Sequence, residues 1–343
     1  MFLTEPVLQV LWYLVLCAAV VMYTILDGFD LGVGILHLFA KSDNDRRVFL
    51  NSIGPVWDGN AVWFVIIGGA LFAGFPAAFA TIFSSFYDLT MVFLAGIIFR
   101  AVAIEFRSKH PEAKWRHFWD VVFSVASITI AFNAGVLLAN LIQGIAIDKD
   151  MNFVGSSLDF FSHYSVLVGF MSVSLFAVHG LTYLLMKTEG ELHARLRKFV
   201  HPVMLTFGAL YLITTLDTLV TMPYMMERFQ EYKILHLLPL AAVIAIASIP
   251  YHIHRKRDGM AFISSSISIV LLYALFGVGT FPVILKSTIN SAYDLTMFNT
   301  SSGVQTLKVI LLIALIGIPL VLAYGYFLYK VFRGKVKLDS SSY

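Results

Sequence analysis

Residues 7–38 read VLQVLWYLVLCAAVVMYTILDGFDLGVGILHL, and this apolar run decides the fold. It exceeds the roughly 20 residues with which a helix crosses a bilayer. Asp27 and Asp30 lie inside it, three residues apart, so a helix places both carboxylates on one face. Because an unpaired charge in lipid is costly, that face should look into protein or water. The pair therefore indicates a site that handles charge; the alternative is a polar pair bonding neighbouring backbone in a glycine-rich, loosened turn.

The composition places the whole chain among multi-pass membrane proteins. Hydrophobic residues make up 59% and charged residues 13% of the sequence, and the mean hydropathy is +0.81. The single cysteine, Cys17, excludes a disulfide framework and a cysteine-based metal site. No Lys or Arg precedes the first apolar run, so we expect a retained span and not a cleaved signal peptide. A net charge of +3 gives no reason to expect nucleic acid.

Nine apolar runs predict an all-α polytopic membrane protein, residues 1–343 forming a single integral membrane domain. Two four-helix units plus one peripheral last helix would account for the odd number of spans. The predicted helices are 7–38, 59–74, 77–104, 119–143, 162–186, 200–223, 236–253, 261–285 and 307–330.

Lys and Arg gather in alternate connections between these runs. Residues 41–51 hold three, 107–116 four, 187–198 four, 255–257 three and the tail after residue 329 four. The intervening connections and their helix edges hold five in all. The positive-inside rule therefore predicts an external N-terminus and a cytoplasmic C-terminus.

Ionisable residues of the first three helices fall at one predicted depth, toward the cytoplasm. Asp27 and Asp30 come late in the first helix, Asp58 opens the second, and Arg100 and Glu105 come late in the third. Such a group predicts a hydrated pocket or a point of proton uptake, because its carboxylates can pair with Arg100 or exchange protons with water.

Simpler roles remain open for three residues of this region. Asp58 is also a suitable N-cap for the second helix. Trp57 is typical of an aromatic belt at the membrane interface. Arg100 can extend its charged end to the interface instead of pairing with a carboxylate.

The remaining buried polar residues are weaker signals. Asp88, near the middle of the predicted third helix, and Asp217, in the sixth, could each line a water path or bond a nearby Ser or Thr. His179 is the only histidine clearly inside a predicted helix, where a hydrogen-bonded core residue is commoner than a ligand. Haem needs axial ligands at matched depth, so we expect no haem and no metal in this chain. Walker, nucleophile-elbow and zinc motifs are also absent from the sequence.

Several motifs resemble subunit II of the cytochrome bd quinol oxidase family. The resemblance extends across most of the chain. It is carried by Asp27-Gly28-Phe29-Asp30-Leu31-Gly32-Val33-Gly34, Asn51-Ser52-Ile53-Gly54-Pro55-Val56-Trp57-Asp58-Gly59-Asn60-x-Val62-Trp63, Gly68-Gly69-Ala70-Leu71-Phe72-Ala73, Arg107-Ser108-Lys109, Trp115-Arg116-x-x-Trp119-Asp120, Gly190-Glu191-Leu192-His193-x-Arg195 and Asn299-Thr300-Ser301-Ser302.

The resemblance implies a haem-free, multi-pass subunit in the bacterial cytoplasmic membrane. Its partner, subunit I, would carry two haems b, haem d and the quinol-oxidising loop, and the complex would oxidise quinol and reduce dioxygen to water with cytoplasmic protons. By this resemblance Asp58 is the expected point of proton uptake. Asp30, Asp27 and Glu105 would lie along the path, and Trp57 and Arg100 would support it or contact a quinone. No catalytic residue is expected here, and a structural quinone and a small single-helix subunit are compatible additions.

Two other functional classes compete with the oxidase subunit. A proton- or cation-coupled secondary transporter could use the acidic residues for coupling, but transporters commonly carry broken helices at matched positions of two repeats. Here the acidic group lies only in the first half of the sequence and at one depth. A purely structural membrane partner is the third class, and scaffolding of a haem subunit is compatible with the first.

Overall fold

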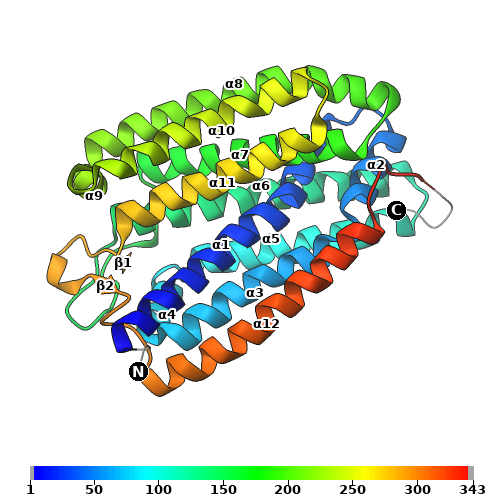
Figure 1. Ribbon diagram of the computed structural model, residues 1–343. Coiled ribbons are helices and arrows are strands. Elements are labelled where there is room, and N and C mark those ends of the chain that lie inside the picture. Colours follow the sequence, from blue (N-terminus) through cyan, green and yellow to red (C-terminus); the bar gives the residue numbers. More distant parts are fainter. Residues whose placement is uncertain (1–3, 339–343) are drawn as a thin grey trace.

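A computed structural model describes residues 4–338 and is mostly helical. Within that range, nine spans are long and apolar enough to cross a membrane, as predicted. Figure 1 shows their helices running side by side along a common direction. They are α1 (Glu5–Leu36), α3 (Trp57–Gly74), α5 (Tyr87–Phe106), α6 (Ala113–Gln143), α7 (His163–Lys187), α8 (Gly190–Thr221), α10 (Leu237–His254), α11 (Asp258–Thr280) and α12 (Val304–Val331).

Shorter elements form the connections. The short α-helices are α2 (Asp43–Ile53), α4 (Pro76–Ser85) and α9 (Glu227–Glu231). The 3-10 helices are η1 (His37–Phe39), η2 (Arg107–Lys109), η3 (Ser157–Phe160), η4 (Pro223–Met226), η5 (Lys233–His236) and η6 (Ser291–Tyr293). Strands β1 (Val283–Leu285) and β2 (Leu295–Thr296) pair antiparallel in the connection before α12.

Helix α1 lies at the centre of the bundle, where it contacts α3, α6, α7, α11 and α12. Its closest approach is to α7. A Cβ atom on Gly32 would lie 2.7 Å from the Cα of Gly180, and the reverse substitution would meet the backbone of Gly32 at 2.3 Å. Glycine at both positions therefore lets the two backbones touch, as small residues do in membrane helix pairs.

The first four spans and the next four each pack among themselves, and α1 and α6 both pack extensively on α7, so the two predicted sets of four form one continuous bundle to which the last helix is added. In the first set, α1 contacts α3 and α6, and α6 contacts α5. In the second, α7 contacts α8 and α11, and α10 contacts α8 and α11. Helix α12 packs on α1 and α3 and is the least buried of the spans in residues 4–338.

Four predicted boundaries are wrong. Helix α6 begins at Ala113, six residues before the predicted 119. The helix expected at 77–104 breaks at Phe86 into α4 and α5, so Asp88 lies in the first turn of α5 and not at mid-helix. Helix α8 begins at Gly190, ten residues before the predicted 200, and accommodates Pro202 in its interior. Helix α11 ends at Thr280, before the predicted 285, because the chain there turns into β1.

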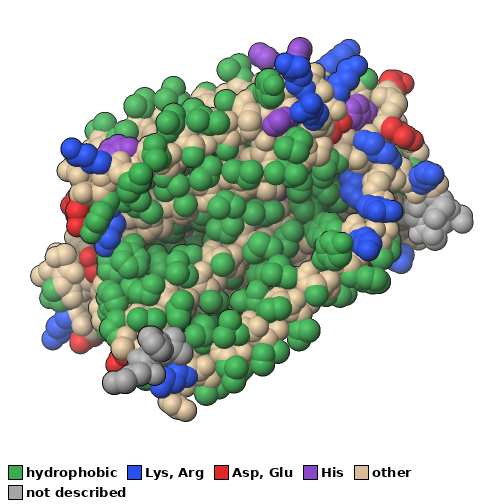
Figure 2. Space-filling view, viewed as in Figure 1, with side chains coloured by type: hydrophobic (Ala, Val, Ile, Leu, Met, Phe, Trp, Pro, Cys, Tyr) green, Lys and Arg blue, Asp and Glu red, His purple; other side chains and the backbone are tan. Residues whose placement is uncertain are grey.

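The two ends of the bundle differ in charge. Figure 2 shows hydrophobic side chains over most of the visible face and Lys and Arg gathered mainly at one end. We call this the α2 end, where α2 and the described C-terminal residues lie, and we call the opposite end the α9 end (Figure 1).

Candidate functional site

An ion pair between Arg100 and Asp27 forms the centre of the candidate site. Nη2 of Arg100, on α5, donates a hydrogen bond of 2.7 Å to Oδ1 of Asp27, on α1. Both residues are only 1% exposed. Arg100 therefore does not reach the membrane interface; it neutralises a carboxylate inside the protein.

Asp30 is held by a different set of partners. Nδ2 of Asn60, on α3, donates to Oδ2 of Asp30 at 2.8 Å, and the hydroxyl of Tyr329, on α12, donates to Oδ1 of Asn60 at 2.7 Å. Four helices thus meet at one polar group. We call it the buried acid cluster and define it as Asp27, Asp30, Asn60, Arg100 and Tyr329.

Helical geometry explains how α1 contributes two carboxylates. Asp27 and Asp30 are three residues apart, so they project from one side of the helix, as predicted. Phe29, between them, points elsewhere and stacks on Tyr183 of α7 with ring centroids 4.0 Å apart. The packing of α1 against α7 therefore fixes the rotation that turns the aspartates toward α3 and α5.

The buried acid cluster contains one more carboxylate than it has cations. In residues 4–338, Asp27 Oδ2, Asp30 Oδ1 and the Nε and Nη1 atoms of Arg100 are buried without a hydrogen-bond partner. Unpaired buried polar atoms are costly and uncommon. Chemically, the cluster can hold a proton on a carboxyl group or bind water between these atoms.

The other predicted site residues lie outside the cluster. Asp58 is exposed in the first turn of α3, and its side chain forms no hydrogen bond or ion pair with any described residue. The capping alternative is wrong, because Val56 is the N-cap of α3. Trp57 is half-buried against the core, and Glu105 is half-buried near the end of α5. Asp58 lies only two residues before Asn60 of the cluster.

A second charged network at the α2 end was not predicted as such. Asp120 of α6 accepts from Nε of Arg107 at 2.6 Å and from Nη1 of Arg46 at 3.0 Å, and its Oδ1 lies 2.6 Å from Nε2 of His37. Arg107 also donates to Asp43 at 2.6 Å. These bonds join η1, α2, η2 and α6. The sequence signal was present in the motifs containing Arg107 and Asp120, but no spacing rule links residues of separate elements.

The other singled-out polar residues have local partners. The ring of His179 lies 2.8 Å from the hydroxyl of Ser265 through Nδ1 and 2.9 Å from the carbonyl of Ile25 through Nε2, so it is a hydrogen-bonded core residue. Asp217 pairs with His163 at 3.2 Å. Asp88 accepts a hydrogen bond of 2.5 Å from Ser157, in η3.

The fully buried histidines of residues 4–338 already have hydrogen-bond partners. His37 and His179, the two fully buried histidines among residues 4–338, use ring nitrogens for Asp120, Ser265 and the backbone. Those residues also contain no group of three or more His, Cys, Asp or Glu side chains suited to a metal ion.

Comparisons with known proteins cover nearly the whole chain. The family described as "Cytochrome bd terminal oxidase subunit II" matches residues 8–332. "Cytochrome bd ubiquinol oxidase subunit 2" of Bacillus subtilis (strain 168) is 36% identical over 330 residues, covering 95% of this chain and 96% of that protein. "Cytochrome bd-I ubiquinol oxidase subunit 2" of Escherichia coli (strain K12) is 30% identical over 361 residues, covering 96% of this chain and 95% of that protein.

A solved structure shares the fold. A chain of the bd oxidase from Geobacillus thermodenitrificans superimposes with a TM-score of 0.80 over 95% of this chain and 98% of that chain. The two sequences are 16% identical there, so this likeness concerns the arrangement of helices alone.

Proposed function

We propose a function from the premise that this chain belongs to the family of cytochrome bd terminal oxidase subunit II, and is thus an oxidoreductase subunit of the bacterial inner membrane. It is the haem-free subunit of a quinol:dioxygen oxidoreductase, and it assembles with a subunit I that carries haems b and d. Family membership and the hydrogen bonds of the buried histidines support this division.

The α2 end faces the cytoplasm in this proposal. Lys and Arg are concentrated in the connections and tail at that end, as the positive-inside rule expects of cytoplasmic segments. The C-terminal residues also lie there (Figure 1). The start of α1 lies at the α9 end, which is external.

The chain also delivers protons from the cytoplasm toward the haem subunit. The buried acid cluster carries this proposal, because it has one carboxylate more than it has cations and lies two residues along α3 from the exposed Asp58. Asp58 takes up a proton at the surface, and Asp30, next to Asn60, holds one inside. Glu105, half-buried near the end of α5, is a second surface group for the same path.

A structural quinone would meet Trp57 rather than Arg100. Arg100 is enclosed and bonded to Asp27, whereas Trp57 is half-buried at the start of α3. A secondary transporter is less well supported, because α1, α3, α5 and α12 are each continuous helices where they contribute to the cluster, unlike the interrupted helices of many transporter sites.

Replacing Asp58 by Asn tests proton delivery. The amide cannot carry a titrating proton, so we expect quinol-driven oxygen uptake per haem to fall about 100-fold or more, within the range typical of lost acid–base groups. Asp58→Glu should retain most of the activity. Haem content should be normal in both variants, because the exposed side chain of Asp58 supports no described contact.

Asp88→Asn is the matched control. Asp88 is also an exposed aspartate in the first turn of a helix, and its replacement should leave oxygen uptake unchanged. Wild-type turnover of Asp58→Asn across the pH range would remove Asp58 from the mechanism. A parallel loss of haem and activity would instead make its role structural.

A further inference from the structure

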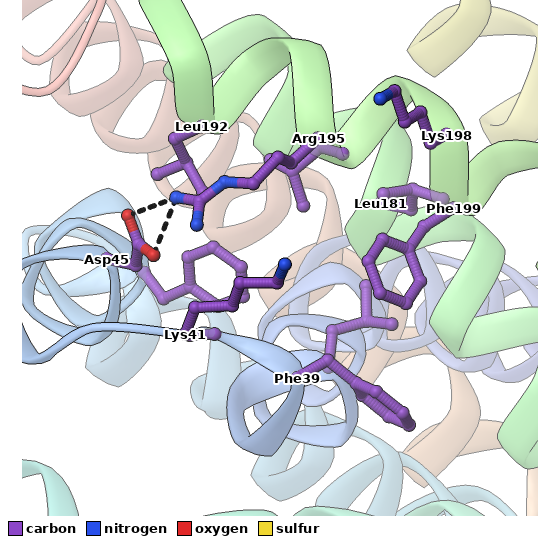
Figure 3. Close-up of a pocket in the computed structure, with 12 residues that line it drawn as sticks. Phe39, Lys41, Asp45, Leu181, Leu192, Arg195, Lys198 and Phe199 are labelled. Atoms are coloured by element: carbon purple, nitrogen blue, oxygen red, sulfur yellow. Dashed lines mark hydrogen bonds and ion pairs between the residues drawn. The ribbon is translucent and has the colours of Figure 1, made fainter.

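A cavity of about 170 Å³ opens at the α2 end, separate from the buried acid cluster (Figure 3). The end of α1, η1, α2, α7 and the first turns of α8 surround it. Its walls are mainly apolar and include Leu36, Phe39, Phe49, Leu181, Leu196 and Phe199. An engineered apolar cavity of similar size, about 150 Å³, holds a benzene molecule, so this one has room for part of an acyl chain.

An exposed aromatic residue stands at the mouth of the cavity. Phe39, in η1 just after the first span, is 61% exposed. Its ring meets that of Phe199 edge to face, with centroids 5.8 Å apart. Because η1 directly follows α1, one of the spans, the cavity opens where a span ends, at the level of the lipid head groups.

Basic side chains surround the same opening. Three of the lining residues are basic, Lys41, Arg195 and Lys198, and one is acidic, Asp45. Arg195 binds both oxygens of Asp45, at 2.8 and 2.7 Å. Its buried Nε forms no hydrogen bond in residues 4–338 and lies 4.0 Å from Oε1 of the exposed Glu191. Lys41 and Lys198 are exposed and make no ion pair with the described chain. Figure 3 shows Lys41 and Arg195 on the same side of the cavity, with Phe199 between Lys198 and Phe39.

We propose that this cavity binds one anionic glycerophospholipid from the leaflet at the α2 end. The phosphate lies among Lys41, Arg195 and Lys198, and the first part of an acyl chain lies against Phe39 and Phe199. Charge complementarity selects this occupant, because basic pockets at the ends of spans attract anionic head groups. A free phosphate would leave the apolar walls unused, and a zwitterionic lipid would gain less from the lysines. The proposal does not depend on the proton path proposed above.

Lipid rebinding to the purified protein tests the site. Material purified through a tag on this chain, with whatever subunits accompany it, is stripped of lipid in detergent. It is then titrated with phosphatidylglycerol or with phosphatidylcholine of the same acyl chains, and bound lipid is counted by native mass spectrometry. We expect one phosphatidylglycerol to bind at least about fivefold more tightly than phosphatidylcholine, the discrimination that roughly one basic residue gives at an anionic surface.

The double variant Lys41→Gln, Lys198→Gln should lose this preference without loss of folding, because both side chains are exposed. The matched control is the double variant Lys330→Gln, Arg333→Gln, which removes two exposed charges near the same end but outside the cavity. This variant should keep the preference for phosphatidylglycerol. Equal binding of the two lipids, or an equal effect of the two double variants, would overturn the proposal. Displacement of the lipid by millimolar inorganic phosphate would also overturn the proposal, since it would show a phosphate site. Crosslinks from Phe39→Cys to a protein subunit would overturn it as well, because they would show that protein covers the mouth of the cavity.

Discussion

Removing either member of the Asp27–Arg100 pair would leave the other charged in the interior of the protein. The two side chains are 1% and 2% exposed, respectively, and Asp30 lies on the same side of α1. A buried charge that loses its partner is far more costly than an exposed one, because water no longer solvates it. The pair is thus a condition for folding as well as a component of the proposed path.

Arg100→Gln should destabilise the protein by about 3–5 kcal/mol, the usual effect of breaking a buried ion pair. Adding Asp27→Asn should recover part of that loss, because the amides carry no charge. Thermal unfolding of the purified protein in one detergent would measure both effects. Arg333→Gln, which removes an exposed arginine of the described tail, should change little. If the double variant loses as much as the two single variants together, the two residues are not energetically coupled.

The sequence predicted the cluster's acids and its arginine, but not all of its members. Asp27, Asp30 and Arg100 stand out because charged residues are rare in apolar runs. Asn60 and Tyr329 do not stand out, because both types are ordinary near the ends of membrane helices. Their hydrogen bonds depend on how α3 and α12 rotate against α1, and that rotation is set by packing between distant segments.

At the scale of helices, apolar length predicted the number of spans in residues 4–338, but less well where they begin and end. The break at Phe86 was missed because the apolar run continues across it, although the backbone of Phe86 leaves the helical conformation between α4 and α5. The early start of α8 was missed because its first turns are rich in charge and lie beyond the apolar part. Hydropathy records which residues tolerate lipid, whereas helix ends depend on hydrogen bonds and turns.

The glycines of α3 predict a contact that this chain does not make by itself. Cβ atoms on Gly68 and Gly69 would meet no atom within 4 Å, in contrast to the crowded Gly32 of α1. Small residues on an open helix face allow a neighbouring helix to approach closely. Within the proposed complex, this face of α3 is suited to a helix of the partner subunit.

Gly69→Leu should therefore weaken recovery of the partner subunit without unfolding this chain. We expect at least about a tenfold lower yield of partner through a tag on the variant, with normal amounts of the variant in the membrane. Gly208→Leu is the control, since Gly208 of α8 also has open space around its Cβ position. Equal recovery with Gly69→Leu and wild type would show that this face of α3 contacts lipid instead.

At the scale of the whole molecule, a mostly apolar interior encloses the buried acid cluster. The central helix supplies two carboxylates, and three other helices bring the groups that hold them. The buried histidines are bonded to side chains and backbone. In the proposed function, cofactors on another subunit carry electrons to dioxygen, whereas hydrogen-bonded polar groups such as these are suited to protons.

This division predicts how haem partitions between the subunits. Expressed alone and purified, the chain should show no reduced-minus-oxidised haem signal, because Nε2 of each fully buried histidine in residues 4–338 already bonds another group, Asp120 for His37 and the carbonyl of Ile25 for His179. When the chain is purified through a tag from cells that also make the partner, a larger, haem-bearing subunit should be recovered with it, and the material should show the spectra of haems b and d. The alternatives give different results. Stoichiometric haem on the isolated chain would contradict the division, and self-association with solute transport in liposomes would favour a secondary transporter.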